Sequence, residues 1–110
     1  MGIFTAALEV DLLPASGDVS AAGNNVLVTP TSGKAIRLYY ASYNPVGGDT
    51  LAAFRFGTAG TLFLRNDAVQ GAIIAKNLRP DYMQGDPDEP LFLYLAVAVS
   101  TRWNVLYAEV

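Results

Sequence analysis

The sequence predicts an all-β fold: one antiparallel β-sandwich domain over residues 1–110, jelly-roll-like, with about eight strands. Apolar and polar residues alternate with a period of two through most of the chain, as in strands with one buried face. Turn residues such as glycine, proline and asparagine recur roughly every 8–12 residues, a spacing typical of sandwiches and barrels. No segment shows the spacing of an amphipathic helix.

The individual strands are predicted in order along the chain, each bounded by turn residues. The first strand alternates cleanly, with Phe4, Ala6, Leu8, Val10 and Leu12 on one face. Residues 14–25, rich in glycine, serine, alanine and asparagine, are expected to form a loop. Residues 78–90, with three prolines and the acidic stretch GDPDEP, are expected to be irregular. The strands are predicted at 4–12, 26–29, 34–44, 51–57, 61–65, 71–76, 91–100 and 101–110.

Composition excludes several classes of function. The formal net charge is −3 and the seven basic residues are scattered, whereas nucleic-acid binding requires clustered lysine and arginine. The chain has no cysteine and no histidine, so thiolate and imidazole chemistry are absent. No apolar run approaches the roughly 18 residues of a membrane span. The first 14 residues lack the basic region of a secretory signal. Neither nucleic acid nor membrane is expected as a partner.

No reaction is predicted, and neither catalytic residues nor a cofactor are expected. Gly33-Lys34 lacks the other residues of a phosphate-binding loop and precedes a strand instead of a helix. Serine and threonine without histidine have no evident activating base. The acidic residues of 86–89, with Asp81 nearby, could ligate Ca²⁺, but we interpret them as a solvated, proline-stiffened loop. We therefore expect no metal site and no enzyme.

Two predicted strands are apolar on both faces, which a sandwich strand with one solvated face does not need. In 34–44 the predicted faces are Ile36, Leu38, Tyr40, Ser42 and Arg37, Tyr39, Ala41, Tyr43. In 91–100 they are Leu91, Leu93, Leu95, Val97, Val99 and Phe92, Tyr94, Ala96, Ala98. One interpretation is central strands whose tyrosine tips reach water beneath covering loops.

The other interpretation is that the outer faces meet a second subunit. Aromatic residues and arginine are enriched in interface cores, where other charged residues are depleted. Only 15% of the residues are charged, against about 25% in typical soluble domains. We favour this interpretation and predict a homo-oligomer, closed into a ring by symmetry. The predicted interface residues are Arg37, Tyr39, Tyr43, Phe92, Tyr94 and Trp103.

The segments VLVTPTSGKAIRLYYASYNP, TLAAFRFG and WNVLYAEV give the chain a resemblance to a family. It resembles small β-sandwich capsid decoration (cement) proteins of tailed bacteriophages, over most of the chain from Val26. The resemblance implies a non-enzymatic virion structural protein on the capsid exterior, which forms a trimer or similar oligomer, binds the major capsid protein and stabilises the head. It carries no motif that assigns individual residues.

Two alternatives remain open. Exposed tyrosine and tryptophan on a sandwich could stack on sugar rings, as in a receptor- or carbohydrate-binding module such as a phage tail-fibre tip or lectin-like domain. Residues 1–13 precede a stretch rich in glycine, serine and alanine, so this strand could be exchanged with a neighbouring subunit.

Overall fold

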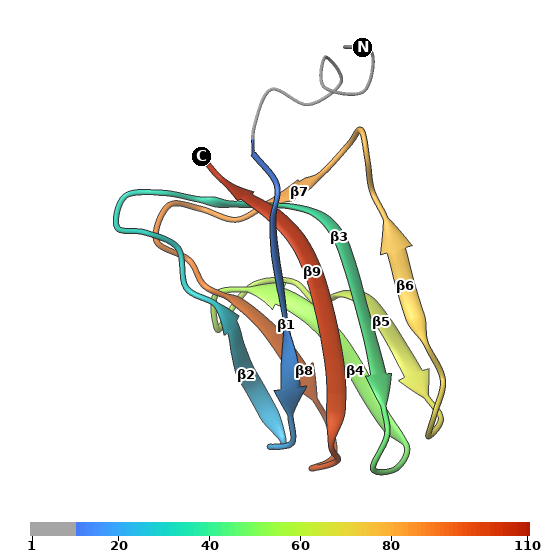
Figure 1. Ribbon diagram of the computed structural model, residues 1–110. Coiled ribbons are helices and arrows are strands. Elements are labelled where there is room, and N and C mark those ends of the chain that lie inside the picture. The colour runs from blue at the N-terminus through green and yellow to red at the C-terminus, as the bar shows by residue number, and fades with distance from the viewer. Residues whose placement is uncertain (1–10) are drawn as a thin grey trace.

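The computed structural model describes residues 11–110, which fold into nine strands; within this range there is no helix (Figure 1). The strands are β1 (Leu13–Val19), β2 (Gly23–Val28), β3 (Ile36–Pro45), β4 (Thr50–Phe56), β5 (Phe63–Ala68), β6 (Ile74–Asn77), β7 (Met83–Gln84), β8 (Leu91–Leu95) and β9 (Thr101–Glu109).

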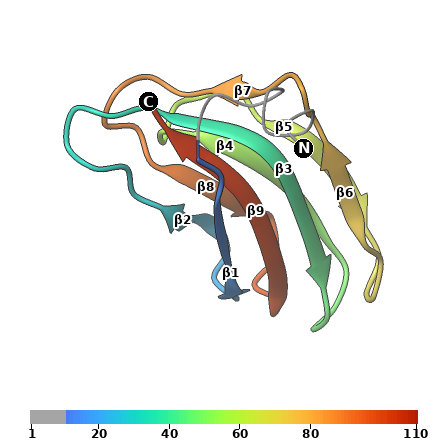
Figure 2. The same cartoon turned by 45° about the horizontal axis from the view of Figure 1, so that its top comes forward.

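The strands form two antiparallel sheets that pack face to face (Figures 1 and 2). One sheet has the order β1-β9-β3-β6, with the short β7 also paired to β3, and the other has the order β2-β8-β4-β5. Consecutive strands often lie in different sheets, so the chain crosses repeatedly between the layers, as in a jelly roll. The predicted fold class is confirmed.

The core lies between the sheets, and β3, β4, β8 and β9 supply most of it. In β3 the pairing with β9 shifts between Leu38 and Tyr40, which marks a β-bulge. Ile36 and Leu38 belong to the buried core before the bulge, and Ala41 and Tyr43 belong to it afterwards. The faces predicted for this strand are therefore wrong beyond Leu38, because one extra residue reverses the alternation.

The loop predicted over residues 14–25 is wrong, because β1 and the start of β2 occupy much of it. β1 pairs along its whole length with β9, from Leu13 opposite Tyr107 to Val19 opposite Thr101. Main-chain hydrogen bonds to a neighbouring strand do not require apolar side chains, so a polar edge strand leaves little signal in the sequence. Most of the strand predicted at 4–12 lies outside the described residues; residues 11 and 12 are not in a strand.

The strand predicted at 91–100 is too long. β8 ends at Leu95, and residues 96–100 turn into β9. Val97 and Val99 therefore do not continue the buried face that begins at Leu91. The other predicted strands correspond to observed ones with shifted ends, while β7 lies in a segment expected to be irregular.

Candidate functional site

Two of the six predicted interface residues belong to the core. Tyr43 is 1% exposed, and its hydroxyl oxygen lies 3.1 Å from the main-chain oxygen of Ala52 and 2.9 Å from that of Leu64, so its one hydrogen is shared between the two acceptors. Burial raises the pKa of the Tyr43 phenol above its usual value. Trp103 is 7% exposed and belongs to the same core cluster. The outward orientation predicted for these two side chains is wrong.

Tyr39 and Phe92 are buried by other parts of the same chain. The Tyr39 ring lies 5.6 Å from the ring of Tyr82, which the 78–82 segment brings over the edge of β3. Phe92 faces away from the core, since it pairs with Arg55 while Leu91 and Leu93 point inward. Because both side chains are buried, neither offers free apolar surface.

Arg55 helps to cover the outer face of the β2-β8-β4-β5 sheet. Its guanidinium donates to the Gly60 main-chain oxygen at 2.7 and 3.0 Å and to Asn24 Oδ1 at 3.4 Å. Asn24 lies on β2, so the side chain of Arg55 reaches across β8 beside Phe92 and Tyr94. This contact fits the interpretation in which the chain covers its own outer face.

Arg37 and Tyr94 are the remaining predicted interface residues, and both are half-buried. The Arg37 guanidinium lies 4.2 Å from the centre of the Tyr82 ring and donates from Nε to Gln84 Oε1 at 2.9 Å. The six residues therefore do not form one exposed patch within the chain. Their role between subunits stays a prediction.

The lower end of the sandwich in Figure 1 presents a different surface. Besides the connection from β1 to β2, this end carries the turns at residues 46–49, 69–73 and 96–100, and we call these three turns the turn end. The Ser100 carbonyl accepts hydrogen bonds from the Val46 and Gly47 N–H groups, at 2.8 and 3.0 Å. The Gly71 N–H donates to the Pro45 carbonyl at 2.7 Å. Each turn is thus held by main-chain contacts to another part of the same end.

Side chains add further ties between the turns. The Gln70 N–H donates to Asp49 Oδ1 at 2.7 Å, and Gln70 Nε2 donates to the Val46 carbonyl at 3.0 Å. The Val97 N–H donates to the Thr50 hydroxyl oxygen at 3.2 Å. These bonds fix the main chain of the turn end, so a partner would bind it with little loss of loop entropy.

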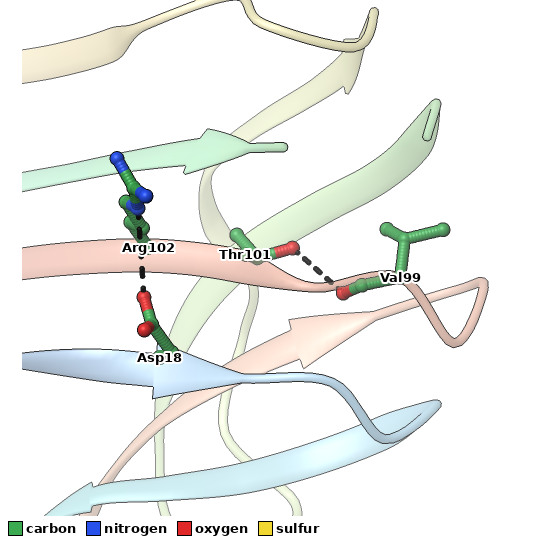
Figure 3. A network of polar contacts seen from close by, with 4 residues as sticks. All are labelled: Asp18, Val99, Thr101 and Arg102. Atoms are coloured by element: carbon green, nitrogen blue, oxygen red, sulfur yellow. Dashed lines mark hydrogen bonds and ion pairs between the residues drawn. The ribbon is translucent and has the colours of Figure 1, made fainter. Parts of the chain in front are cut away.

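Figure 3 shows where β9 leaves the turn end. The Thr101 hydroxyl donates to the Val99 main-chain oxygen at 3.0 Å, which supports the corner before β9. Beside it, Arg102 Nε lies 3.9 Å from Asp18 Oδ1 on the neighbouring β1. Both side chains of that pair are about two-thirds exposed, so the pair adds little to stability.

The turn end exposes aliphatic side chains on this fixed scaffold. Val69 is 62% exposed, Val97 50% and Ile73 73%. Val69 and Val97 line a hollow of about 300 Å³ together with Leu51, with Asp67 among the other lining residues. An exposed apolar cluster on a rigid surface is typical of a contact site for another protein.

Sequence reasoning misses this surface because Val97 and Val99 continue the alternation of β8 and are therefore placed on its buried face. One weak signal is present. The segment AVAVS at 96–100 contains no charged residue, no glycine and no proline, although one predicted strand ends and the next begins there. The turn there is imposed by tertiary hydrogen bonds and not by turn residues.

The opposite end of the sandwich is acidic, and its carboxylates bind main-chain groups. Asp88 Oδ1 accepts from the Gly33 N–H at 2.6 Å, and Glu89 Oε1 accepts from the Asp86 N–H at 2.7 Å. Glu109 accepts from the Thr31 N–H, and this bond holds the pKa of the Glu109 carboxyl below its usual value. Within residues 11–110, no three acidic side chains gather closely enough to hold a metal ion.

No helix among the described residues is long and apolar enough to cross a membrane.

Comparisons with known proteins give a fold likeness without a family. No protein-family model matches the chain, and the curated proteins contain no match. One similar solved structure belongs to the Bacillus endospore appendages, described as "a novel family of disulfide-linked pili". It is 13% identical, with a TM-score of 0.51, over 91% of this chain and 86% of that one. This sequence has no cysteine, so the two proteins share a fold but not the means of disulfide linkage.

Proposed function

We propose that this protein is a non-enzymatic structural subunit that works within a larger protein assembly. The observation that carries the proposal is the turn end, where Val69, Ile73 and Val97 are exposed on turns fixed by hydrogen bonds. Burial of these three side chains against another protein would stabilise the contact by about 25 cal/mol per Å² of apolar surface removed from water. The low fraction of charged residues supports the same proposal, since a solvated surface usually carries more charge.

At a finer level, we propose a capsid decoration protein of a tailed bacteriophage, bound to the major capsid protein on the virion exterior as a homotrimer. The resemblance of its strand segments to such proteins supports this placement. A compact jelly roll with a rigid apolar end is also suited to clamping neighbouring subunits, because it can press on a lattice without deforming.

A second candidate is a subunit that polymerises with itself into a surface appendage. The fold likeness to a pilus subunit favours this candidate. Self-assembly would have to proceed without disulfides, because the sequence has no cysteine. The two candidates differ in what the turn end would contact: a capsid lattice in one and further copies of this chain in the other.

Cosedimentation separates the candidates. The purified chain would be mixed with empty capsids of a tailed bacteriophage, assembled from its major capsid protein, then pelleted and imaged by electron microscopy. A decoration protein saturates the capsids at a fixed ratio, whereas an appendage subunit forms filaments without them. Both candidates would be contradicted if the protein stays monomeric, does not bind capsids and binds glycans on an array. That result would favour the carbohydrate-binding alternative.

A further inference from the structure

We propose that the N-terminal segment of one copy packs its apolar face on the turn end of a second copy, so that subunits join head to tail. This inference rests on the proposed function as an assembly subunit and names the contact that joins two copies. The contacting residues would be Phe4, Ala6 and Leu8 of one copy and Val69, Ile73 and Val97 of the next.

The sequence of the N-terminal segment suits such a contact. Its apolar residues lie at alternate positions from Phe4 to Val10, so an extended chain presents them on one face. Glu9 and Asp11 fall on the opposite face, away from the proposed contact. The segment lies outside the described residues, and it is long enough to cover a surface of a few side chains.

The place where the segment joins the sandwich favours a second copy over its own. Leu13, the first residue of β1, pairs with Tyr107 near the end of β9, at the end opposite the turn end (Figure 1). From Leu13 to Val19, β1 alone spans about 20 Å toward the turn end. Leu8 precedes Leu13 by five positions, so its Cα can lie at most about 17 Å away. Leu8 therefore falls short of the turn end of its own chain.

The turn end offers a surface that matches an apolar strand. The hollow between Val69 and Val97 has Leu51 in its lining and a volume of about 300 Å³, enough to admit a large side chain. Asp49 and Asp67 also line it, so a strand that carries its own acidic residues must direct them away. The alternation in the N-terminal segment does this, because Glu9 lies between Leu8 and Val10.

Crosslinking between two different chains tests the contact directly. Because the sequence has no cysteine, each variant with one introduced cysteine has a single thiol. A tagged Leu8→Cys chain would be mixed with an untagged Val97→Cys chain and mildly oxidised. We expect a mixed disulfide dimer on a non-reducing gel, several times more abundant than the dimer formed with Ser16→Cys, an exposed site on β1. Equal yields at both sites, or a mixed dimer at neither, would overturn the inference.

A charge on the segment supplies a second test that does not depend on thiol chemistry. Leu8→Asp places a charge on the proposed contact face, while Ala7→Asp places it on the opposite face. In sedimentation velocity of the full chain, we expect Leu8→Asp to lose the assembled species and Ala7→Asp to keep it. If the wild-type chain stays monomeric yet binds capsids, the inference and the proposed homotrimer are both wrong, while the proposed role as a capsid decoration protein is retained. If it assembles equally well with either substitution, the inference falls and the structural role stands.

Discussion

Tyr43 connects the two sheets through its hydroxyl group. The phenol crosses the core from β3, and its one hydroxyl hydrogen is shared between the main-chain oxygens of Ala52 and Leu64, which belong to the opposite sheet. A tyrosine used in this way is fixed by its hydrogen bonds as well as by its packing. The sequence predicts that Tyr43 faces outward as part of an aromatic surface. The structure has no such surface, because this side chain lies in the core.

We expect Tyr43→Phe to destabilise the protein by about 1–3 kcal/mol, because removal of the hydroxyl leaves a buried carbonyl without its donor. The free energy of unfolding would be measured by urea denaturation. Tyr82→Phe is the matched control, since Tyr82 is 45% exposed and its hydroxyl can bind water. Equal stability of the two variants would contradict the role given to the Tyr43 hydroxyl.

The lowered pKa of Glu109 predicts how the stability of the protein depends on pH. Its folded-state pKa is lowered from the usual 4.5, chiefly by hydrogen bonds from Thr31 and also by the charge of Lys34. A carboxyl with a lowered folded pKa favours the native state above its unfolded pKa, and this contribution disappears as pH falls through the folded value. We therefore expect the urea midpoint to decrease below about pH 4.5.

Glu109→Gln isolates that contribution. The variant should be less stable than the wild type near pH 7, and the difference should shrink as the pH is lowered through the acidic range. Urea midpoints measured at a series of pH values would show this. A difference that stays constant at every pH would mean that the Glu109 carboxylate does not contribute through its charge.

At the scale of elements, β1 depends on a close contact with β9. Gly17 pairs with Trp103, and a Cβ added at Gly17 would lie 3.3 Å from atoms of the indole ring. The absence of a side chain therefore lets the ring lie against the β1 main chain. This contact accounts for glycine within a strand whose composition is typical of a loop.

We expect Gly17→Ala to destabilise the protein by about 1 kcal/mol, because the rigid indole must shift to accommodate the methyl group. Trp103 is the sole tryptophan, so its fluorescence would report the shift and the unfolding transition together. Ser16→Ala, on the exposed face of the same strand, should leave both unchanged. Unaltered fluorescence and stability in Gly17→Ala would contradict the packing of Trp103 on β1.

The sequence predicts elements well where one face is buried along a whole strand. β4 and β9 are predicted near their observed limits, β4 because turns that contain glycine flank it, and β9 because Trp103 and Val105 alternate with polar residues at its start. Prediction fails where main-chain pairing decides the structure. β1 is held by β9 despite polar side chains, and the bulge near Tyr39 reverses the facing of Tyr43 without any mark in the sequence.

The candidate site is harder to predict than the fold. The low charge fraction fits the exposed aliphatic side chains of the turn end, but the aromatic residues to which the sequence assigns an exposed surface fold inward or lie beneath Arg55 and the 78–82 segment. Exposed surface depends on which residues remain once the core is filled, and that requires the tertiary structure. Val69 and Val97 lie far apart in sequence. They line the same hollow only because hydrogen bonds hold their two turns at the same end of the sandwich.

The whole molecule is a jelly roll with two unlike ends. The acidic end holds the end of β9 and the start of β1, while the turn end exposes aliphatic residues on a fixed main chain (Figure 1). Unlike ends allow subunits to associate in one direction, and a contact between two different surfaces can build either a ring or a filament.

The most informative experiment compares Val97→Asp with Val26→Asp by sedimentation velocity and capsid cosedimentation, after circular dichroism has shown that both variants fold. The two valines are similarly exposed, at 50% and 55%, but Val97 lies on the turn end and Val26 on the outer face of β2. We expect Val97→Asp to lose self-assembly and capsid binding, because a buried unpaired charge is strongly unfavourable, while Val26→Asp behaves like the wild type. If Val97→Asp assembles or binds as the wild type does, the turn end is not the contact surface and the proposed assembly role of this end is wrong.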